Sequence, residues 1–319
     1  MKWIVVVFAF LFFAQDGSSQ SYPSRPIRLI VPLSPGGFAD TPARMLAPRL
    51  AEQLGKPVIV ENRPGAGGTI GWESVAKSAP DGYTLAIAGS TQLIGAHLYR
   101  KLPYDTFKDF THITMVASGP YVLVVNWRKL EVNSVRELIA AARRQPGKLD
   151  FGSSGNGSSQ HLVGALFNAM AGVELNHVPY KGSGPAMQDL LAAQIGISFA
   201  GVPNVLGHVR SGKLKALAVT TPKRWSELPE VPTLAEAGVP GYEATLWLCI
   251  SGPAGLPAPI VQRLQSEIGR ALQDSELQAS FRAAGVEAVA MAQPELAIYM
   301  RAEYEKWGKV VRDTGATVN

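Results

Sequence analysis

The chain is poor in the residues that build disulfides, metal sites and nucleic-acid interfaces. Its 319 residues include one cysteine and five histidines, and no Cys/His spacing suits a zinc site. Thirty Lys and Arg against 25 Asp and Glu leave a net charge of +5, without a basic stripe that would follow a nucleic-acid backbone. We therefore expect no metal and no nucleic-acid partner. Cys249 lies in the apolar run from Leu246 to Ile250, which predicts a buried thiol rather than a reactive one.

No apolar run approaches the roughly 18 residues that a membrane-spanning helix needs. The N-terminal run follows Lys2, extends from Trp3 to Ala14 and is succeeded by small polar residues up to Ser21. This order is typical of an export signal. We expect residues 1–21 to be cleaved and the mature protein to lie in the periplasm. An uncleaved membrane anchor is the alternative, because a clean A-x-A cleavage site is missing.

The signatures of common cofactor sites and catalytic centres are also missing. No glycine-rich loop ends in the G-K-[ST] of a P-loop, and the spacing in Gly65–Gly71 does not fit a dinucleotide-binding turn, which favours close packing or helix initiation there. There is no G-x-S-x-G elbow and no H-E-x-x-H. His161 follows Ser159 by two residues on a predicted helix, so their side chains point apart and cannot form a catalytic pair. We expect neither a cofactor nor an enzymatic reaction.

What the chain does contain is a regular alternation of short apolar runs and amphipathic segments from Ile27 onward. This order predicts an α/β fold of parallel sheets covered by helices. The predicted strands span residues 27–33, 58–61, 83–88, 121–125, 149–152, 175–178, 197–200, 214–219 and 244–250. A capping box at Ser134 and Glu137 predicts a helix that ends before Pro146. A last helix is predicted from the spacing of Leu296, Met300, Tyr304, Trp307 and Val311.

These strands are too many for one sheet around a single core, which predicts two α/β lobes. The uninterrupted apolar segments 121–125 and 244–250 look able to run from one lobe to the other. We therefore expect a first lobe built from residues 22–122 and 244–319, and an inserted second lobe built from residues 123–243. Such an arrangement leaves a cleft between the lobes, which is a usual place for a ligand.

Two loops, one in each predicted lobe, could bind an anion in that cleft. Each leaves a strand, contains glycines that allow close approach of a ligand, and enters a helix whose free N–H groups and dipole favour negative charge. The candidate ligand-binding residues of these loops are Ser34, Gly36, Gly37, Phe38, Ala39 and Asp40 in the first, and Ser153, Ser154, Gly155, Gly157, Ser158 and Ser159 in the second. Asp40 has two interpretations, as a helix cap that accepts from the amide of Ala43 or as a contact for a ligand ammonium group.

Further candidates follow other predicted strands. Ser90 and Thr91 come after the strand that ends at residue 88, and Tyr180 and Gly182 join a strand to a helix. His161 is either a packed histidine or part of the pocket wall. Lys181 either attracts an acid or remains solvated. Trp72 and Trp247 are expected in the core.

A family resemblance rests on stretches spread over nearly the whole chain after residue 21. They are YPSRPIRLIVPLSPGGFAD (22–40), VIVENRPGAGGTIG (58–71), PDGYTL (80–85), FGSSGNGSSQHL (151–162), VPYKGSGPAMQDLL (178–191), GKLKALAVT (212–220), LPEVPTLAEAGVPGYE (228–243) and GPAGLPAPIV (252–261). In these stretches the chain resembles the solute-binding receptors of tripartite tricarboxylate transporters, often called Bug receptors.

The resemblance implies a two-lobed periplasmic binding protein fold, type II-like, that closes over a small carboxylate held by the loops at 34–40 and 153–159. It also implies membrane permease subunits as partners. The chain departs from the family pattern at Ala165, at Gly196, where an acidic residue is common, and near Leu248 and Cys249. We expect a monomeric receptor for a small organic acid, which could be a dicarboxylate, a tricarboxylate, an acidic amino acid or an aromatic acid. The alternatives are a periplasmic α/β enzyme and a ligand sensor that use the same cleft.

Overall fold

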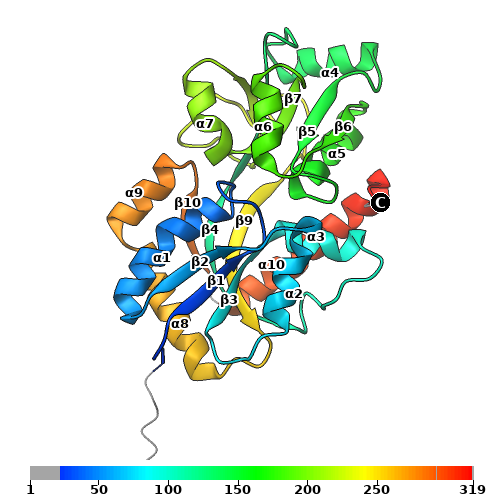
Figure 1. The fold of residues 1–319 in the computed structure, drawn as a ribbon. Coiled ribbons are helices and arrows are strands. Elements are labelled where there is room, and N and C mark those ends of the chain that lie inside the picture. Colours follow the sequence, from blue (N-terminus) through cyan, green and yellow to red (C-terminus); the bar gives the residue numbers. More distant parts are fainter. Residues whose placement is uncertain (1–21, 292, 318–319) are drawn as a thin grey trace, which may run out of the picture.

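The computed structural model describes residues 22–291 and 293–317, which form two α/β lobes (Figure 1). The export signal predicted over residues 1–21 lies outside the described residues. The strands are β1 Ile27–Val31, β2 Val58–Asn62, β3 Thr84–Gly89, β4 Phe110–Val125, β5 Asp150–Ser153, β6 Asn176–Pro179, β7 Ile197–Gly201, β8 Lys215–Val219, β9 Thr245–Pro253 and β10 Glu287–Met291. The helices are α1 Asp40–Leu54, α2 Thr69–Ala76, α3 Ser90–Leu98, α4 Val135–Arg144, α5 Ser159–Ala171, α6 Ser183–Leu191, α7 Val202–Arg210, α8 Ala258–Leu272, α9 Ser275–Ala283 and α10 Gln293–Thr314, with a short 3₁₀ turn at Ala66–Gly68.

The sheet of the first lobe has the strand order β2-β1-β3-β9-β4, with β10 beside β4. Strands β1, β2 and β3 are parallel, whereas β9 runs antiparallel to β3 and β4. Alternate residues of β1 face opposite layers of helices, as the two-residue period of a strand requires. Leu29 and Val31 pack with α1 and α8, and Ile30 packs with Trp72 of α2.

The sheet of the second lobe is formed by β5, β6, β7, β8 and the C-terminal part of β4. Strand β7 pairs antiparallel with β4, and β5 lies parallel to both β6 and β7. Phe151 of β5 and Phe199 of β7 are fully buried against Phe167 of α5. Burial on both faces explains why β7 and the C-terminal part of β4 read as nearly continuous apolar runs.

Strands β4 and β9 connect the two lobes, and they correct the sequence-based prediction in two respects. The prediction of all-parallel sheets is wrong, because β4 pairs antiparallel with β9 from Phe110 to Pro120. The predicted strand at 121–125 also begins much earlier, at Phe110. Its first half contains polar residues that interrupt the apolar pattern, such as the buried Thr114 and the partly buried His112, whose Nδ1 lies 2.8 Å from Ser251 Oγ. Strand β10, which is short and half exposed, was not predicted.

Several local predictions are confirmed. Helix α4 begins after Ser134, whose Oγ accepts from the Glu137 amide at 3.2 Å. The last helix is α10, with Leu296, Met300 and Trp307 buried. It contacts α3 of the first lobe and α5 of the second. Cys249 is fully buried, and burial raises the pKa of its thiol to about 12. No helix within residues 22–291 and 293–317 is long and apolar enough to cross a membrane.

Candidate functional site

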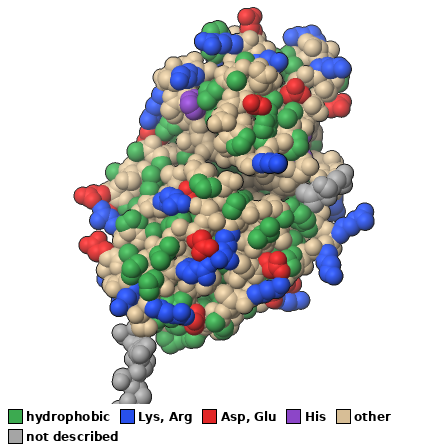
Figure 2. All heavy atoms as spheres, in the orientation of Figure 1, with side chains coloured by type: hydrophobic (Ala, Val, Ile, Leu, Met, Phe, Trp, Pro, Cys, Tyr) green, Lys and Arg blue, Asp and Glu red, His purple; other side chains and the backbone are tan. Residues whose placement is uncertain are grey.

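A cavity of about 580 Å³ lies between the two lobes, where the molecular surface is hollowed (Figure 2). The first lobe contributes the loop before α1, the glycine-rich turn before α2, and the end of β3 with the start of α3. The second lobe contributes the loops before α5, α6 and α7. Tyr121 of β4 and residues 246–248 of β9 complete the wall near the strands that join the lobes.

The starts of six helices, α1, α2, α3, α5, α6 and α7, therefore face one cavity. The first amides of a helix have no partner within the helix, and the helix dipole adds partial positive charge. Five of these helices are preceded by Ala39, Gly68, Gly89, Gly182 or Gly201, and none of those five positions carries a side-chain cap. The cavity wall is thus rich in N–H groups that a ligand can reach.

The charge of the wall agrees with this. Among the described residues that line the cavity there is no Asp or Glu, and the charged residue is Lys181. An acidic guest would meet donors and no repelling carboxylate. Nor does the described part of the chain hold a group of three or more His, Cys, Asp or Glu side chains placed to bind a metal ion.

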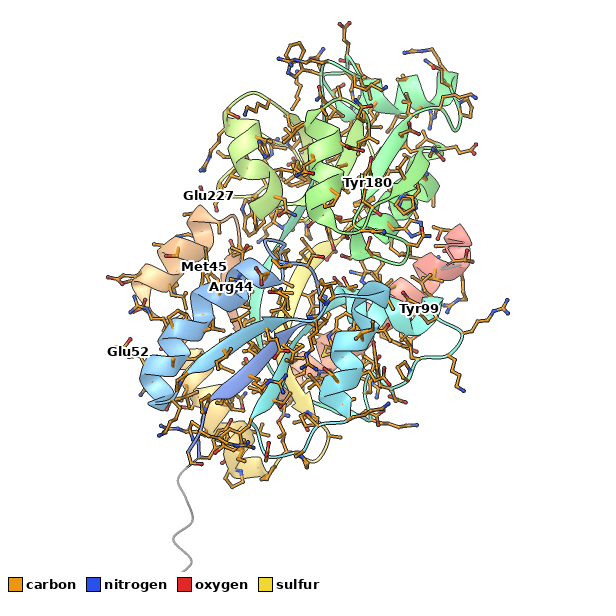
Figure 3. All side chains as sticks on the ribbon, viewed as in Figure 1. Arg44, Met45, Glu52, Tyr99, Tyr180 and Glu227 are labelled. Carbon is orange, nitrogen blue, oxygen red and sulfur yellow. The ribbon has the colours of Figure 1, made fainter. Side chains whose placement is uncertain are left out.

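The loop of the first lobe is held by a charged network behind the cavity wall. Asp40 is 3% exposed, and its carboxylate accepts from Gly36 N at 2.8 Å, Arg44 Nε at 2.9 Å and Asn62 Nδ2 at 2.8 Å. Burial favours the neutral acid, but these hydrogen bonds outweigh it and hold the pKa of Asp40 below its ordinary value. Figure 3 shows Arg44 on α1, at the side of the first lobe.

This network corrects the interpretation of Asp40 as a helix cap. Asp40 is the first residue of α1 and the cap position is Ala39, so the carboxylate turns back to the Gly36 amide instead of reaching Ala43. Within the described residues Asp40 does not line the cavity, so it orders the loop from behind. The amides of Gly37, Phe38 and Ala39 donate to no partner in the described structure and remain for a ligand.

The loop of the second lobe is held by neutral groups. Ser154 N donates to Gln160 Oε1 at 2.8 Å, and Gly155 N donates to Ser153 Oγ at 3.1 Å. Gly157 N donates to His161 Nδ1 at 3.3 Å. Most interior amides of this loop are therefore already engaged. The amides that keep no partner among the described residues belong to Asn156, Ser159 and Gln160, the last two at the start of α5.

Two stacked histidines support this second loop. The rings of His161 and His177 lie 3.9 Å apart at 8°, and His177 Nε2 lies 2.6 Å from Ser153 Oγ. Burial lowers the pKa of both rings, that of His177 to about 3, with a further contribution from the neighbouring His161. Both imidazoles are consequently neutral and can accept the hydrogen bonds that order the loop.

Most of the candidate residues predicted from the sequence come together in the cavity wall. Those that line it are Ser34, Gly37, Phe38, Ala39, Ser90, Thr91, Ser154, Gly155, Ser158, Ser159, Tyr180 and Gly182. Those that lie behind it are Gly36, Asp40, Ser153, Gly157 and His161. Of the two interpretations of His161, the structure favours the packed histidine. Lys181 is exposed at the wall.

Sequence reasoning missed part of the wall. Residues 65–68 line the cavity although they were assigned only to packing or helix initiation, and their position between β2 and α2 was the available signal. Trp72 and Trp247 are buried as expected, yet both also border the cavity. Tyr99, which lies after α3, and Tyr121 carried no signal in the sequence (Figure 3 labels Tyr99).

The lobes touch on either side of the cavity. Thr91 Oγ1 of the first lobe lies 3.3 Å from Ser159 Oγ of the second. Elsewhere, Gly182 of the second lobe lies close to Ser34 of the first, since a Cβ placed on Gly182 would be 3.1 Å from Ser34 Oγ. The two lobes are therefore close enough for donors from both to reach a single small molecule.

Comparison with known proteins decides the family. Residues 42–316 of the chain match the protein family described as tripartite tricarboxylate transporter family receptor. The chain belongs to this receptor family. Its relatives include Protein BugT of Bordetella pertussis, which is 41% identical over 301 residues covering 94% of this chain and 92% of that protein. The family assignment predicted from the sequence motifs is thus confirmed.

Solved structures place the receptor in the two-lobed periplasmic binding protein fold, as predicted. Rpa4515 of R. palustris with adipate has a TM-score of 0.89 at 37% identity, covering 93% of this chain and 100% of that one. MatC of Rhodopseudomonas palustris with bound malate has a TM-score of 0.85 at 31% identity, covering 91% and 100%.

Proposed function

We propose that the protein is a receptor that captures a small organic carboxylate between its lobes and delivers it to the permease subunits of a tripartite transporter. The observation that carries the proposal is the convergence of six helix starts on one cavity whose described wall contains no Asp or Glu. The ligand-binding role of the residues that line it is part of this proposal.

The related receptors support the class of ligand. One holds adipate and another holds malate, and both of these guests carry two carboxylates. A tricarboxylate, an acidic amino acid and an aromatic acid fit the same donor set, and they belong to the panel that must be tested.

The number of donors is sufficient for tight binding. A micromolar dissociation constant needs about 8 kcal/mol. A hydrogen bond to a charged group contributes roughly 1.5–3 kcal/mol, so four or five donors from both lobes supply this amount. One loop alone does not, which makes closure of the lobes over the guest part of the proposal.

The proposal also includes the lobe boundaries, the location and the oligomeric state expected from the sequence. The first lobe comprises residues 22–122 and 244–319 and the second residues 123–243, in keeping with the change of sheet along β4 near Tyr121. The receptor acts as a monomer in the periplasm after removal of residues 1–21, and it performs no reaction on its guest. A periplasmic enzyme and a ligand sensor are the alternative functions.

A thermal-shift screen of small carboxylates, followed by calorimetry, tests the proposal. The panel contains adipate and malate, together with the neutral diamide of adipate as a matched control. A guest at 100 times its dissociation constant adds about 2.7 kcal/mol to the stability of the folded state. We expect at least one acid to raise the melting temperature, the diamide to leave it unchanged, and the acid to be recovered intact. No shift with any acid, or turnover of the acid, contradicts the proposed function.

A further inference from the structure

Tyr121 lies where β4 passes from one sheet to the other. Its backbone is fixed on both sides, because Tyr121 N donates to Thr220 Oγ1 at 2.9 Å and Thr220 N donates to Tyr121 O at 3.0 Å. Tyr121 also pairs with Gly201 of β7. The residue is 1% exposed, yet it is one of the residues that line the cavity. The position of its ring is therefore set by the strands that join the lobes.

The hydroxyl of Tyr121 is buried and has no hydrogen-bond partner within the described residues. The side chains of Ser159 and Ser90 lie near enough to act on the pKa of the Tyr121 hydroxyl, although neither forms a hydrogen bond with it. Burial raises the pKa of Tyr121, and these neighbours offset only part of the rise, so the phenol keeps its proton. A buried donor without an acceptor destabilises the folded state, and such donors are rare in native proteins.

Two other buried or partly buried tyrosines provide a contrast. The Tyr180 hydroxyl donates to Asp189 Oδ2 at 2.8 Å, and the Tyr242 hydroxyl donates to Val163 O at 2.7 Å. Each of them has an acceptor within the protein. Tyr121 borders the cavity and lacks one, so an acceptor supplied by a guest would satisfy it.

We propose that the Tyr121 hydroxyl donates a hydrogen bond to an oxygen of the bound acid at the end of the cavity where the lobes join. This inference rests on the proposed function and deepens it. Ser90 begins α3 of the first lobe and Ser159 begins α5 of the second, so the hydroxyl stands between donors from both lobes. A guest must reach this end of the cavity to satisfy it, and Tyr121 thereby selects acids with an oxygen acceptor at that position.

The variant Tyr121→Phe tests the inference because it removes only the oxygen. The probe is the member of the carboxylate panel that the wild type binds most tightly by calorimetry. We expect the dissociation constant to rise about ten- to hundred-fold, as for loss of a hydrogen bond to a charged group. The melting temperature of the free protein stays the same or rises, because a donor without a partner has been removed.

Tyr242→Phe is the matched control. It removes an equally buried hydroxyl that has a protein acceptor and lies outside the cavity wall, so it lowers the melting temperature and leaves the affinity unchanged. Unchanged affinity in Tyr121→Phe would overturn the inference and leave the proposed function intact. A loss of stability in Tyr121→Phe as large as in Tyr242→Phe would show that the protein already satisfies the hydroxyl, and would overturn it too. A wild type that binds no acid overturns both proposals.

Discussion

The two glycine-rich loops that face each other across the cavity are ordered by different chemistry. In the first lobe one buried carboxylate, that of Asp40, accepts hydrogen bonds from Gly36, Arg44 and Asn62. In the second lobe neutral hydroxyl, amide and imidazole groups engage the interior amides of the loop. Both networks leave amides without a partner, just before the start of α1 in the first lobe and at the start of α5 in the second. The shape of the loop and its means of support are therefore separable.

The difference also affects where negative charge lies relative to the cavity. A carboxylate close to an anion site would weaken binding, but Asp40 lies behind the wall and is compensated by the Arg44 guanidinium. The second loop avoids the difficulty by using uncharged side chains. The two supports should therefore respond differently to substitution and to pH, and the following experiments rank these responses.

The largest effect is expected from Gly155→Val in the second loop. Gly155 has φ of 127°, and a Cβ there would lie 3.0 Å from Tyr180 O. The substituted loop must move, and we expect calorimetry to detect no binding while circular dichroism shows the fold retained. Gly212→Val is the control, since Gly212 also has positive φ but has open space around it away from the cavity. Normal affinity in Gly155→Val would remove the second loop from the site.

Asp40→Asn should have the next largest effect. It removes the charge that binds Arg44 and weakens the acceptor of the Gly36 amide, which we expect to cost about 1–3 kcal/mol in the free energy of unfolding and to weaken binding about ten-fold. Ser153→Ala, the counterpart in the second loop, removes a neutral acceptor and should cost only about 1 kcal/mol. Urea denaturation and calorimetry measure both quantities.

The control for these variants is Asp274→Asn, which alters the cap of α9 outside the cavity wall. It should lower stability without changing affinity. If Asp40→Asn and Ser153→Ala proved equally costly, the distinction between a charged and a neutral support would be wrong.

A smaller effect is expected from pH. The pKa of His177 is lowered to about 3, so the folded state resists protonation, and its contribution to stability is lost as pH falls below the ordinary histidine value of 6.5. The pKa of Asp40 is lowered from 3.8, so its contribution is lost only as pH falls below that value. Between pH 6.5 and 4.5 the second loop should weaken while the first does not.

His177→Gln should therefore reduce the slope of the unfolding free energy against pH in this window, by at most about 1.4 kcal/mol per pH unit for one proton. Asp40→Asn should leave the slope between pH 6.5 and 4.5 unchanged. The wild type and both variants are compared by urea denaturation at half-unit intervals. Equal slopes in the wild type and His177→Gln would contradict the assignment of this titration to the second loop.

The smallest effect is expected from Lys181→Ala. Lys181 is exposed, so its attraction for an anion is screened by water and salt. We expect affinity to fall two- to three-fold at low ionic strength, by about the size of a surface charge interaction, and the difference to disappear in high salt. Lys213→Ala, which removes an exposed charge of the same lobe away from the cavity wall, should leave affinity unchanged. A large, salt-independent loss would mean that Lys181 contacts the guest directly.

The sequence allowed the strand–helix alternation and the two loops to be predicted, because apolar period and glycine position are local properties. The supports of the loops could not be predicted in full. Arg44 lies four residues after Asp40 on one helix face, which was a usable signal. Asn62 reaches Asp40 only because β2 pairs with β1, and His177 reaches His161 only because β6 lies beside α5. The free hydroxyl of Tyr121 likewise depends on where two lobes meet, and no local pattern records that.

Because the cavity wall contains much main chain, the shape of the pocket and its supply of N–H donors are set by different parts of each residue. An amide is supplied by every residue except proline, so replacing side chains along the wall keeps the donors wherever the backbone keeps its path. The shape of guest that fits can instead change through substitution of lining side chains such as Trp72 and Tyr99. Receptors built on such a scaffold can therefore differ in the guest that they admit while offering it the same main-chain donors.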